Sequence, residues 1–207
     1  SKQEGKLQLS LQQLETAVTA HSPDTKWYRY FVNRSAVALI VRESAGLEVL
    51  MIKRADRKGD PWSGHMAFPG GRMDKTDRHG LAAATRETWE EIGLADNHYS
   101  DCLGRLSDVT SRPHKGIRPM VISPYVFSID RTPDLTLNYE VADVIWVPLG
   151  FLADQNNRET MQWQMKKMTF TLPCYFYQQQ RIWGLSLLML DELLRLIDQR
   201  QHCLRTQ

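Results

Sequence analysis

The stretch FPGGRMDKTDRHGLAAATRETWEEIGL, from Phe68 to Leu94, decides the fold of this chain. A glycine pair opens the stretch, and a helical segment with Glu87, Glu90 and Glu91 closes it. At about 100° per residue, these carboxylates span about 100° of the helix circumference. The sequence therefore predicts a helix with one acidic face.

The other face of this helix is expected to pack against the protein. Leu81, Trp89 and Ile92 fall opposite the glutamates, so we expect Trp89 to be buried and the carboxylates to be exposed. The glutamates repel one another, and Arg86 can pair with only part of them, at i,i+4 to Glu90. The excess of carboxylate oxygen predicts a site for a hard divalent cation such as Mg²⁺, the alternative being a plain solvated acidic face.

The residues around this helix resemble the signature of the Nudix hydrolase family, G x5 E x7 REUxEExGU, where U is a bulky aliphatic residue. Gly71 opens the signature, and RETWEEIGL, from Arg86 to Leu94, closes it. Two positions depart from it: Asp77 stands for the first glutamate, with eight instead of seven residues before Arg86, and Thr88 replaces the aliphatic residue. An added residue is absorbed most easily in a loop. The chain is therefore identified as a member of this family.

The resemblance implies hydrolysis of a nucleoside diphosphate linked to another group, with Mg²⁺ or Mn²⁺ as cofactor. A cation neutralises the diphosphate oxygens and lowers the pKa of the attacking water. Carried over position by position, the implied metal ligands are Glu87, Glu90, Glu91 and the Gly71 carbonyl. Arg86 would orient these carboxylates and would not touch the substrate.

The resemblance leaves the catalytic base open. Glu90 or Glu91 could serve, and Glu140 matches a position where many Nudix proteins carry an acid near the metals; its alternative is a surface charge at a strand end. Arg54, before a long loop, is the candidate ligand of a substrate phosphate. Gly70 and Gly71 are expected to let the backbone approach metal and phosphate, since a side chain there would hinder the turn. The expected catalytic set is Arg86, Glu90, Glu91 and Glu140.

Part of the pattern of one Nudix branch, the coenzyme A diphosphatases, is present in LMIKR (50–54) and GHMAFPGG (64–71). That branch has a threonine where Ile52 stands and an arginine where Asp60 stands, so a base is replaced by an acid. Three hypotheses stay open: a diphosphatase for coenzyme A or an acyl derivative, the same chemistry on ADP-ribose, a nucleotide sugar or an oxidised nucleotide, and a non-catalytic ligand-sensing domain. Because every helix glutamate is present, the third ranks lowest.

The composition of the whole chain limits its partners. At 207 residues it can bury the core of a single domain, and 26 basic against 24 acidic residues give a net charge of +2 without a basic stripe for nucleic acid. Its three cysteines lack metal-binding spacing, which favours reduced thiols. The start SKQEGKLQLS shows no signal peptide, and no apolar run could span a membrane. We expect a cytoplasmic protein acting on a small molecule.

Apolar spacing predicts two regions. Residues 1–33 are expected to form a helical extension, because Leu7, Leu11, Leu14 and Val18 recur with helical spacing. This helix would either cover the core or form a homodimer contact. The Nudix hydrolase domain is expected over residues 34–200.

Within that domain the pattern predicts an α/β fold, the α/β/α sandwich with a mixed sheet that the resemblance implies. Strands are expected at 35–41 and 47–52, as a hairpin, and at 105–109, 120–129, 141–147, 161–165 and 167–177; a further helix is expected at 185–198. Trp146 and Trp183 are expected to be core aromatics and not ligand platforms.

Overall fold

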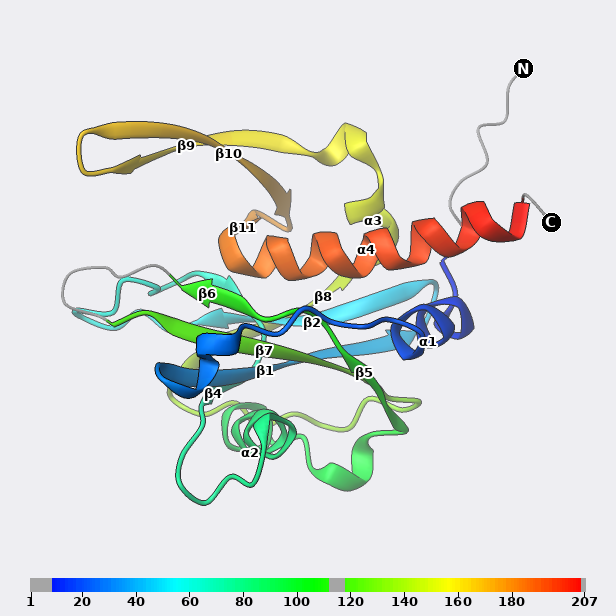
Figure 1. Ribbon diagram of the computed structural model, residues 1–207, viewed down its shortest axis with the longest axis horizontal. Helices are drawn as coiled ribbons and strands as arrows, with labels where there is room; N and C mark the ends of the chain where they lie inside the picture. The colour runs from blue at the N-terminus through cyan, green and yellow to red at the C-terminus, as the bar shows by residue number, and fades with distance from the viewer. Residues whose placement is uncertain (1–8, 112–117, 206–207) are drawn as a thin grey trace.

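The computed structural model describes residues 9–111 and 118–205, with side chains as far as residue 198. Figure 1 shows helices on both sides of a central sheet. The helices are α1 (Leu11–Thr19), α2 (Gly80–Ile92), α3 (Leu149–Ala153) and α4 (Gly184–Arg205), with short 3-10 turns η1 (Trp27–Tyr30), η2 (Asp96–His98) and η3 (Gln155–Asn157). The strands are β1 (Asn33–Glu43), β2 (Leu47–Arg54), β3 (Met66–Ala67), β4 (Gly70–Arg72), β5 (Asp101–Arg105), β6 (Val109–Ser111), β7 (Met120–Ser128), β8 (Val141–Pro148), β9 (Glu159–Met165), β10 (Met168–Tyr177) and β11 (Gln180–Trp183).

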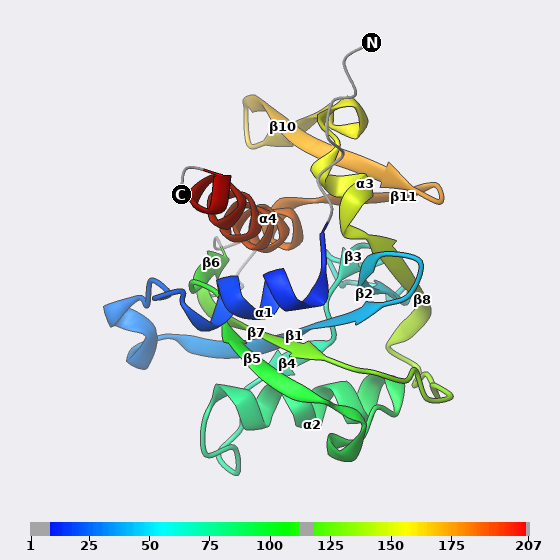
Figure 2. The same ribbon diagram turned by 90° about the vertical axis from the view of Figure 1, so that its right-hand side faces the viewer.

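The main sheet is mixed, as expected. Strand β1 pairs in parallel with β7 and antiparallel with β2 and β4, while β8 and β3 flank β2 and β5 and β6 flank β7. Helix α2 lies on one side of this sheet, and α1 and α4 lie on the other (Figures 1 and 2). The fold is the α/β/α sandwich that the sequence predicted. Strands β9, β10 and β11 form a second sheet.

Alternation along β1 divides the core into two layers. Leu39 and Val41 belong to the layer that includes α1 and α4, whereas Ala38 and Ile40 belong to the layer under α2. Both faces of the sheet are therefore shielded from water, because successive strand residues point to opposite sides and helices cover each side.

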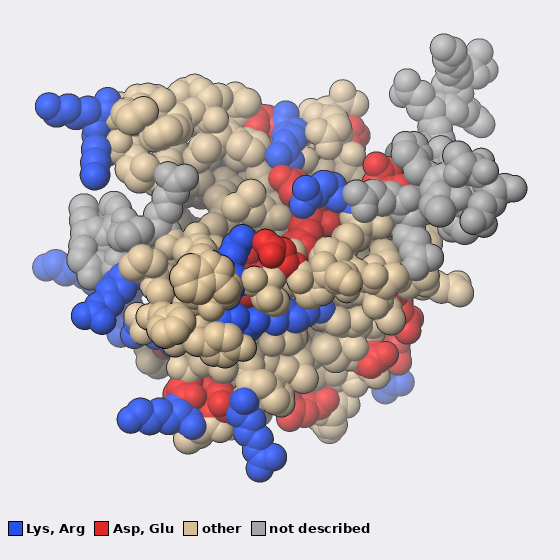
Figure 3. All heavy atoms as spheres, viewed as in Figure 1, with Lys and Arg blue, Asp and Glu red and all other residues tan. Residues whose placement is uncertain are grey.

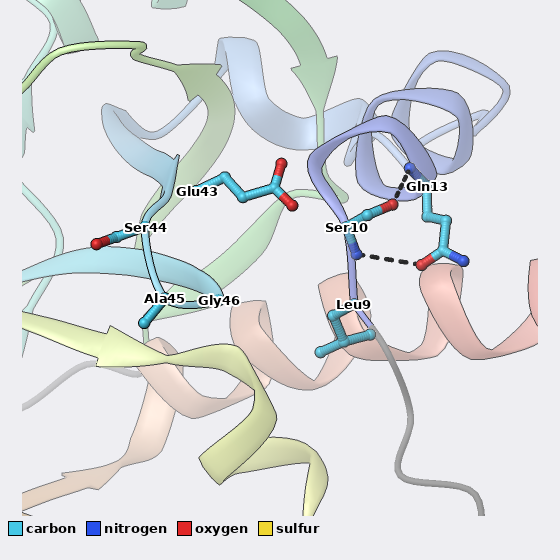
Figure 4. Close-up of a pocket in the computed structure, with 7 residues that line it drawn as sticks. All are labelled: Leu9, Ser10, Gln13, Glu43, Ser44, Ala45 and Gly46. Carbon is cyan, nitrogen blue, oxygen red and sulfur yellow. Dashed lines mark hydrogen bonds between the residues drawn. The ribbon is translucent and has the colours of Figure 1, made fainter.

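Helix α1 covers the core of its own chain. Ser10 and Gln13 form a capping box at its start, and Leu14 and Val18 are buried in the layer shared with α4. The expected helix included Leu7, which lies outside the described residues. A hollow of about 320 Å³ opens beside this cap at the β1–β2 turn (Figure 4).

The expected strand at 105–109 is wrong. Strand β5 ends at Arg105 and β6 begins at Val109, because the backbone between them bonds elsewhere: the amide of Leu106 donates to Pro124, and that of Asp108 donates to Asp24. The chain turns there so that the Asp108 side chain points inward. The hairpin of β1 and β2 and the final helix are confirmed.

The Asp108 carboxylate is fully buried and anchors the segment before β1. It accepts hydrogen bonds from the Ser123 hydroxyl at 2.7 Å and the Lys26 amide at 3.0 Å, and it pairs with Arg29 at 3.6 Å and with Arg105. Arg29 is itself only 8% exposed. Breaking a buried pair of this kind is costly, because the remaining charge stays buried without its partner.

No helix within residues 9–111 and 118–205 combines the length and the apolar character that crossing a membrane requires.

We expect Asp108→Ala to lower the free energy of unfolding by about 3 kcal/mol, because it leaves Arg29 without its buried partner. Urea denaturation measures this change. Asp24→Ala is the matched control, since the Asp24 side chain is 70% exposed and pairs with Lys26 at the surface. Equal stability of the two variants would show that the Asp108 cluster contributes nothing.

Candidate active site

The candidate site lies where strand β4 packs against helix α2. Strand β4 pairs with the start of β1, so that Gly70 lies opposite Val37 and Gly71 opposite Ala36. A Cβ atom at Gly70, whose φ is +154°, would lie 2.3 Å from the Ala36 carbonyl oxygen. Any side chain there would collide with backbone, so glycine is required for the strand to pass.

Gly71 lies directly against the Glu87 carboxylate. A Cβ atom at this position would lie 2.6 Å from the carboxyl carbon of Glu87 and 2.8 Å from its oxygens. Burial raises the pKa of Glu87, and Glu90 and Glu140 act in the same direction, while Arg86 opposes them. The missing side chain thus makes room for a carboxylate beside the strand backbone.

Glu91 is the most deeply placed carboxylate of the helix, with 3% of its surface exposed. Its Oε1 accepts a hydrogen bond from the Gly70 amide at 2.9 Å. Burial raises its pKa to about 8, and the charges of Glu87 and Glu140 add to this effect. A cation bound nearby would stabilise the ionised form of this carboxyl group and so lower its pKa.

The expected faces of α2 are therefore corrected. Trp89 is 57% exposed, while Glu91 lies in the buried stripe with Ala84, Thr88 and Ile92. These four follow i, i+4, i+7 and i+8 spacing, and Trp89 falls outside them. The Thr88 hydroxyl donates to the Ala84 carbonyl at 2.7 Å, which allows a polar residue at the aliphatic position of the signature.

Arg86 ties the loop after β4 to the helix. It donates to both oxygens of Asp77, at 3.0 and 2.9 Å, to the Arg72 carbonyl at 3.2 Å, and to Glu87 and Glu90 at 3.0 and 3.3 Å. Hydrogen bonds to Asp77 raise the pKa of Arg86, and that of Asp77 is lowered in return. In the sequence, Asp77 differs from the signature, but its role as the bidentate partner of Arg86 was not predicted. Its place in the glutamate position of the signature was the signal.

Glu140 and Arg54 come to the site from the ends of two paired strands, since Arg54 is the last residue of β2 and Glu140 directly precedes β8. The Ala55 amide donates to the Glu140 carbonyl at 2.9 Å, and the Asn138 amide donates to the Glu91 carbonyl at 2.9 Å. The chain before β8 is thereby held beside the end of α2. The side chain of Glu140 is exposed, and its charge raises the pKa of Glu91 while that of Arg54 lowers it.

Arg54 is paired with Asp60, the acid that stands where the coenzyme A branch has an arginine. The guanidinium donates to Asp60 at 2.8 Å, and the other oxygen of Asp60 accepts from the Trp62 amide at 3.0 Å. Although burial acts against it, these contacts lower the pKa of Asp60. Asp60 thus fixes both the loop and the arginine that precedes it.

The structure brings Glu87, Glu91, Gly70 and Gly71 together, with Glu140 and Arg54 at the rim, whereas Glu90 turns to Arg86 and its side chain is 45% exposed. The candidate ligand atoms are all oxygen, and among the described residues Glu91 forms no ion pair. Their chemistry fits a hard divalent cation. Within 9–111 and 118–205, however, no three His, Cys, Asp or Glu side chains are already gathered as ligands.

The NUDIX domain family model matches residues 32–171. An uncharacterised protein of Schizosaccharomyces pombe is 37% identical over 107 residues, which is 50% of this chain and 32% of that protein. The mitochondrial coenzyme A diphosphatase NUDT8 of Mus musculus is 29% identical over 151 residues, covering 72% of this chain and 70% of the relative.

A solved structure of similar fold is the MutT/nudix family protein of Enterococcus faecalis. It has a TM-score of 0.52 and 21% identity, and the match covers 96% of this chain and 75% of that one. At this level of identity the likeness concerns the fold alone.

We expect Gly71→Ala to weaken Mn²⁺ binding about tenfold while the protein stays folded, because the new methyl group displaces the Glu87 carboxylate. Titration calorimetry with Mn²⁺ measures the affinity, and circular dichroism reports the fold. Gly46→Ala is the matched control, because a Cβ atom there meets nothing within 4 Å. Unchanged Mn²⁺ affinity in Gly71→Ala would remove Glu87 from the proposed metal site.

Proposed function

We propose, since this chain belongs to the NUDIX family, that it is a metal-dependent hydrolase that cleaves the diphosphate bond of a nucleoside diphosphate-linked compound. The observation that carries this proposal is the buried Glu91 carboxylate held against the Gly70 amide. A carboxylate in that position can act as a ligand of a cation bound in the site. The proposed cofactor is Mg²⁺ or Mn²⁺.

The metal ligands that we propose are Glu87, Glu91 and the Gly71 carbonyl, with Glu90 as a further ligand. When bound, the metal would neutralise diphosphate oxygens and lower the pKa of the attacking water. Arg86 holds Glu87 and Glu90 in place through charge-assisted hydrogen bonds and is held itself by Asp77. The protein thereby fixes its ligands before the substrate arrives.

Glu140 is the proton acceptor that the contacts favour. Glu91 already accepts from Gly70, and Glu90 accepts from Arg86. The Glu140 side chain is exposed at the rim, near enough for its charge to act on Glu87 and Glu91. A proton acceptor needs access to water as well as proximity to the reacting group, and these two observations support Glu140 in that role.

Coenzyme A or an acyl derivative is the proposed substrate class. The similarity to the murine coenzyme A diphosphatase supports it, as does the run GHMAFPGG (64–71), which resembles part of the pattern of the coenzyme A branch. Arg54 is the proposed ligand of a substrate phosphate. Because Arg54 is paired with Asp60, a phosphate would compete with that carboxylate for the guanidinium.

We expect Glu91→Gln to lower kcat/KM by about a hundredfold or more with Mg²⁺, because the amide cannot bind the metal as a carboxylate does. The assay measures products released from coenzyme A, ADP-ribose, nucleotide sugars, dinucleoside polyphosphates and oxidised nucleotides. Glu15→Gln, at an exposed position on α1, is the control. Near-wild-type turnover in Glu91→Gln would contradict the metal role, and wild-type silence across the panel would favour a ligand-sensing domain.

The same variant makes a separate prediction about stability. Folding raises the pKa of Glu91 from an ordinary 4.5 to about 8, so the ionised form is disfavoured in the folded protein as the pH rises through this range. Without metal at pH 8, Glu91→Gln should therefore unfold at the same or a higher temperature than the wild type. Lower stability would show that activity was lost through the fold.

We expect Arg54→Gln to raise KM about tenfold, with a smaller effect on kcat, because it removes the cation proposed for the substrate phosphate. Steady-state kinetics on the best substrate of the panel measure both constants. Arg57→Gln changes the same charge at an exposed position of the same loop and serves as the control. An equal KM in the two variants would assign Arg54 to loop structure alone.

A further inference from the structure

The second sheet extends from the body as an arm. We define the arm as the hairpin of β9 and β10, residues 159–177, which pairs with β11 at its base. Figure 1 shows the hairpin projecting past the start of α4 on the side where β6 lies, and Figure 3 shows a recessed band of surface between it and the body. A two-stranded ribbon of this kind gains little stability from its own contacts.

One face of the arm is apolar and the other is polar. Residues directly opposite each other in the hairpin share a face. On one face the opposed pairs are Met161 with Leu172, Trp163 with Phe170, and Met165 with Met168. On the other face Gln162 opposes Thr171, joined by a side-chain hydrogen bond, and Gln164 opposes Thr169. The apolar face stays partly open to solvent, and Met168 is 63% exposed.

Aromatic rings continue from this face to the body. The Phe170 and Trp163 rings are 6.2 Å apart, the Trp163 and Trp183 rings are 6.2 Å apart, and the Trp183 ring lies 5.5 Å from that of His65. We call these four residues the ring ladder. The expectation that Trp183 is a core aromatic is therefore corrected, because it is only partly buried and links the arm to the loop before β3.

The ring ladder begins beside the candidate active site. The Arg54 amide donates to the His65 carbonyl at 3.0 Å, so the two residues are neighbours across the start of β3. The Arg54 side chain is near both features, because its charge lowers the pKa of Glu91 and of His65. A substrate whose phosphate meets Arg54 would have the ring ladder within reach of the group attached to that phosphate.

We propose that the ring ladder and the apolar face of the arm bind a long, flexible, apolar substituent of the diphosphate substrate, of the fatty acyl or alkyl class. The proposal rests on the proposed function, because it places the diphosphate at Arg54 and the helix carboxylates. It makes Trp163, Phe170 and Trp183 specificity-determining residues.

The extent and composition of the surface favour this class of ligand. The ladder has three successive steps of 5.5 to 6.2 Å, more than one base ring can cover. Methionines accompany the rings on the hairpin face, and methionine adapts to flexible apolar ligands. Arg54 and Arg181, whose charges both act on His65, match the anionic end of such a substrate.

The test compares two ligands that differ only in the tail. They are the ethyl and decyl esters of the α,β-methylene analogue of ADP, which carry the same charge and cannot be hydrolysed at the diphosphate, titrated with Mg²⁺ present. We expect the decyl ester to bind the wild type at least tenfold more tightly, and its affinity to rise along an ethyl-to-decyl series. Equal affinity of the two analogues would overturn the proposal, and this comparison needs no variant and no turnover. Failure of the proposed function would instead appear as absent hydrolysis across the substrate panel.

Variants locate the effect on the arm. We expect Trp163→Ala to abolish the preference for the decyl ester and to change affinity for the ethyl ester less than twofold, while Trp163→Phe retains the preference. Gln162→Ala, on the polar face of the same strand, is the matched control and should behave as the wild type. An unchanged preference in Trp163→Ala, or an equal loss for both ligands, would overturn the proposal. Light scattering measures the oligomeric state of each variant. If the wild type is a dimer that dissociates in Trp163→Ala while the ligand preference is unchanged, this face is a contact between copies of the chain, and the proposal is overturned.

Discussion

The structure depends on the close approach of a strand backbone to a helix carboxylate, made by the Gly70 amide and Glu91. Gly70 can lie there only without a side chain, because β1 runs directly beside it. A buried carboxylate then has one backbone donor and no ion pair among those of the described residues. Burying such a group costs free energy unless something compensates. In this protein that cost falls next to the residues that the NUDIX signature singles out.

The charged side chains on the outer side of α2 are paired, whereas within the described part of the chain the carboxyl group on its inner side is not. On the outer side, Arg86 and Asp77 form a bidentate pair that also neutralises Glu90 and the near oxygen of Glu87. On the inner side, Glu91 faces only Gly70 and the charges of its neighbours. One arginine therefore keeps the outer helix face ordered, while the buried Glu91 carboxyl forms no ion pair among the described residues. This arrangement explains why a motif with three glutamates needs its arginine.

Much of this could be predicted from the sequence, and the failures have a physical pattern. The signature placed α2, and alternation placed β1 and β2 as a hairpin, because both signals are local. The burial of residues on α2 was predicted wrongly. A prediction from hydrophobicity buries a tryptophan before a glutamate, but the face of α2 that packs against the sheet contains Glu91 and not Trp89. Strands β3 and β4 are too short to show a period. The pairing of Arg54 with Asp60 and the path of rings from His65 to the arm depend on tertiary contacts, which a single sequence does not display.

The contact between the first and last described helices has a consequence for how the chain is made. Helix α1 packs against α4, and His21 lies 2.8 Å from Glu192, which is 171 residues further along the chain. Glu192 also accepts from the amide and hydroxyl of Ser107, so it joins three distant segments. Contacts of such sequence separation slow folding, because a long loop must close before they form. On the ribosome, the core layer above the sheet thus stays open until α4 has emerged, and during that interval α1 and the strands beneath it present apolar surface that a chaperone would recognise.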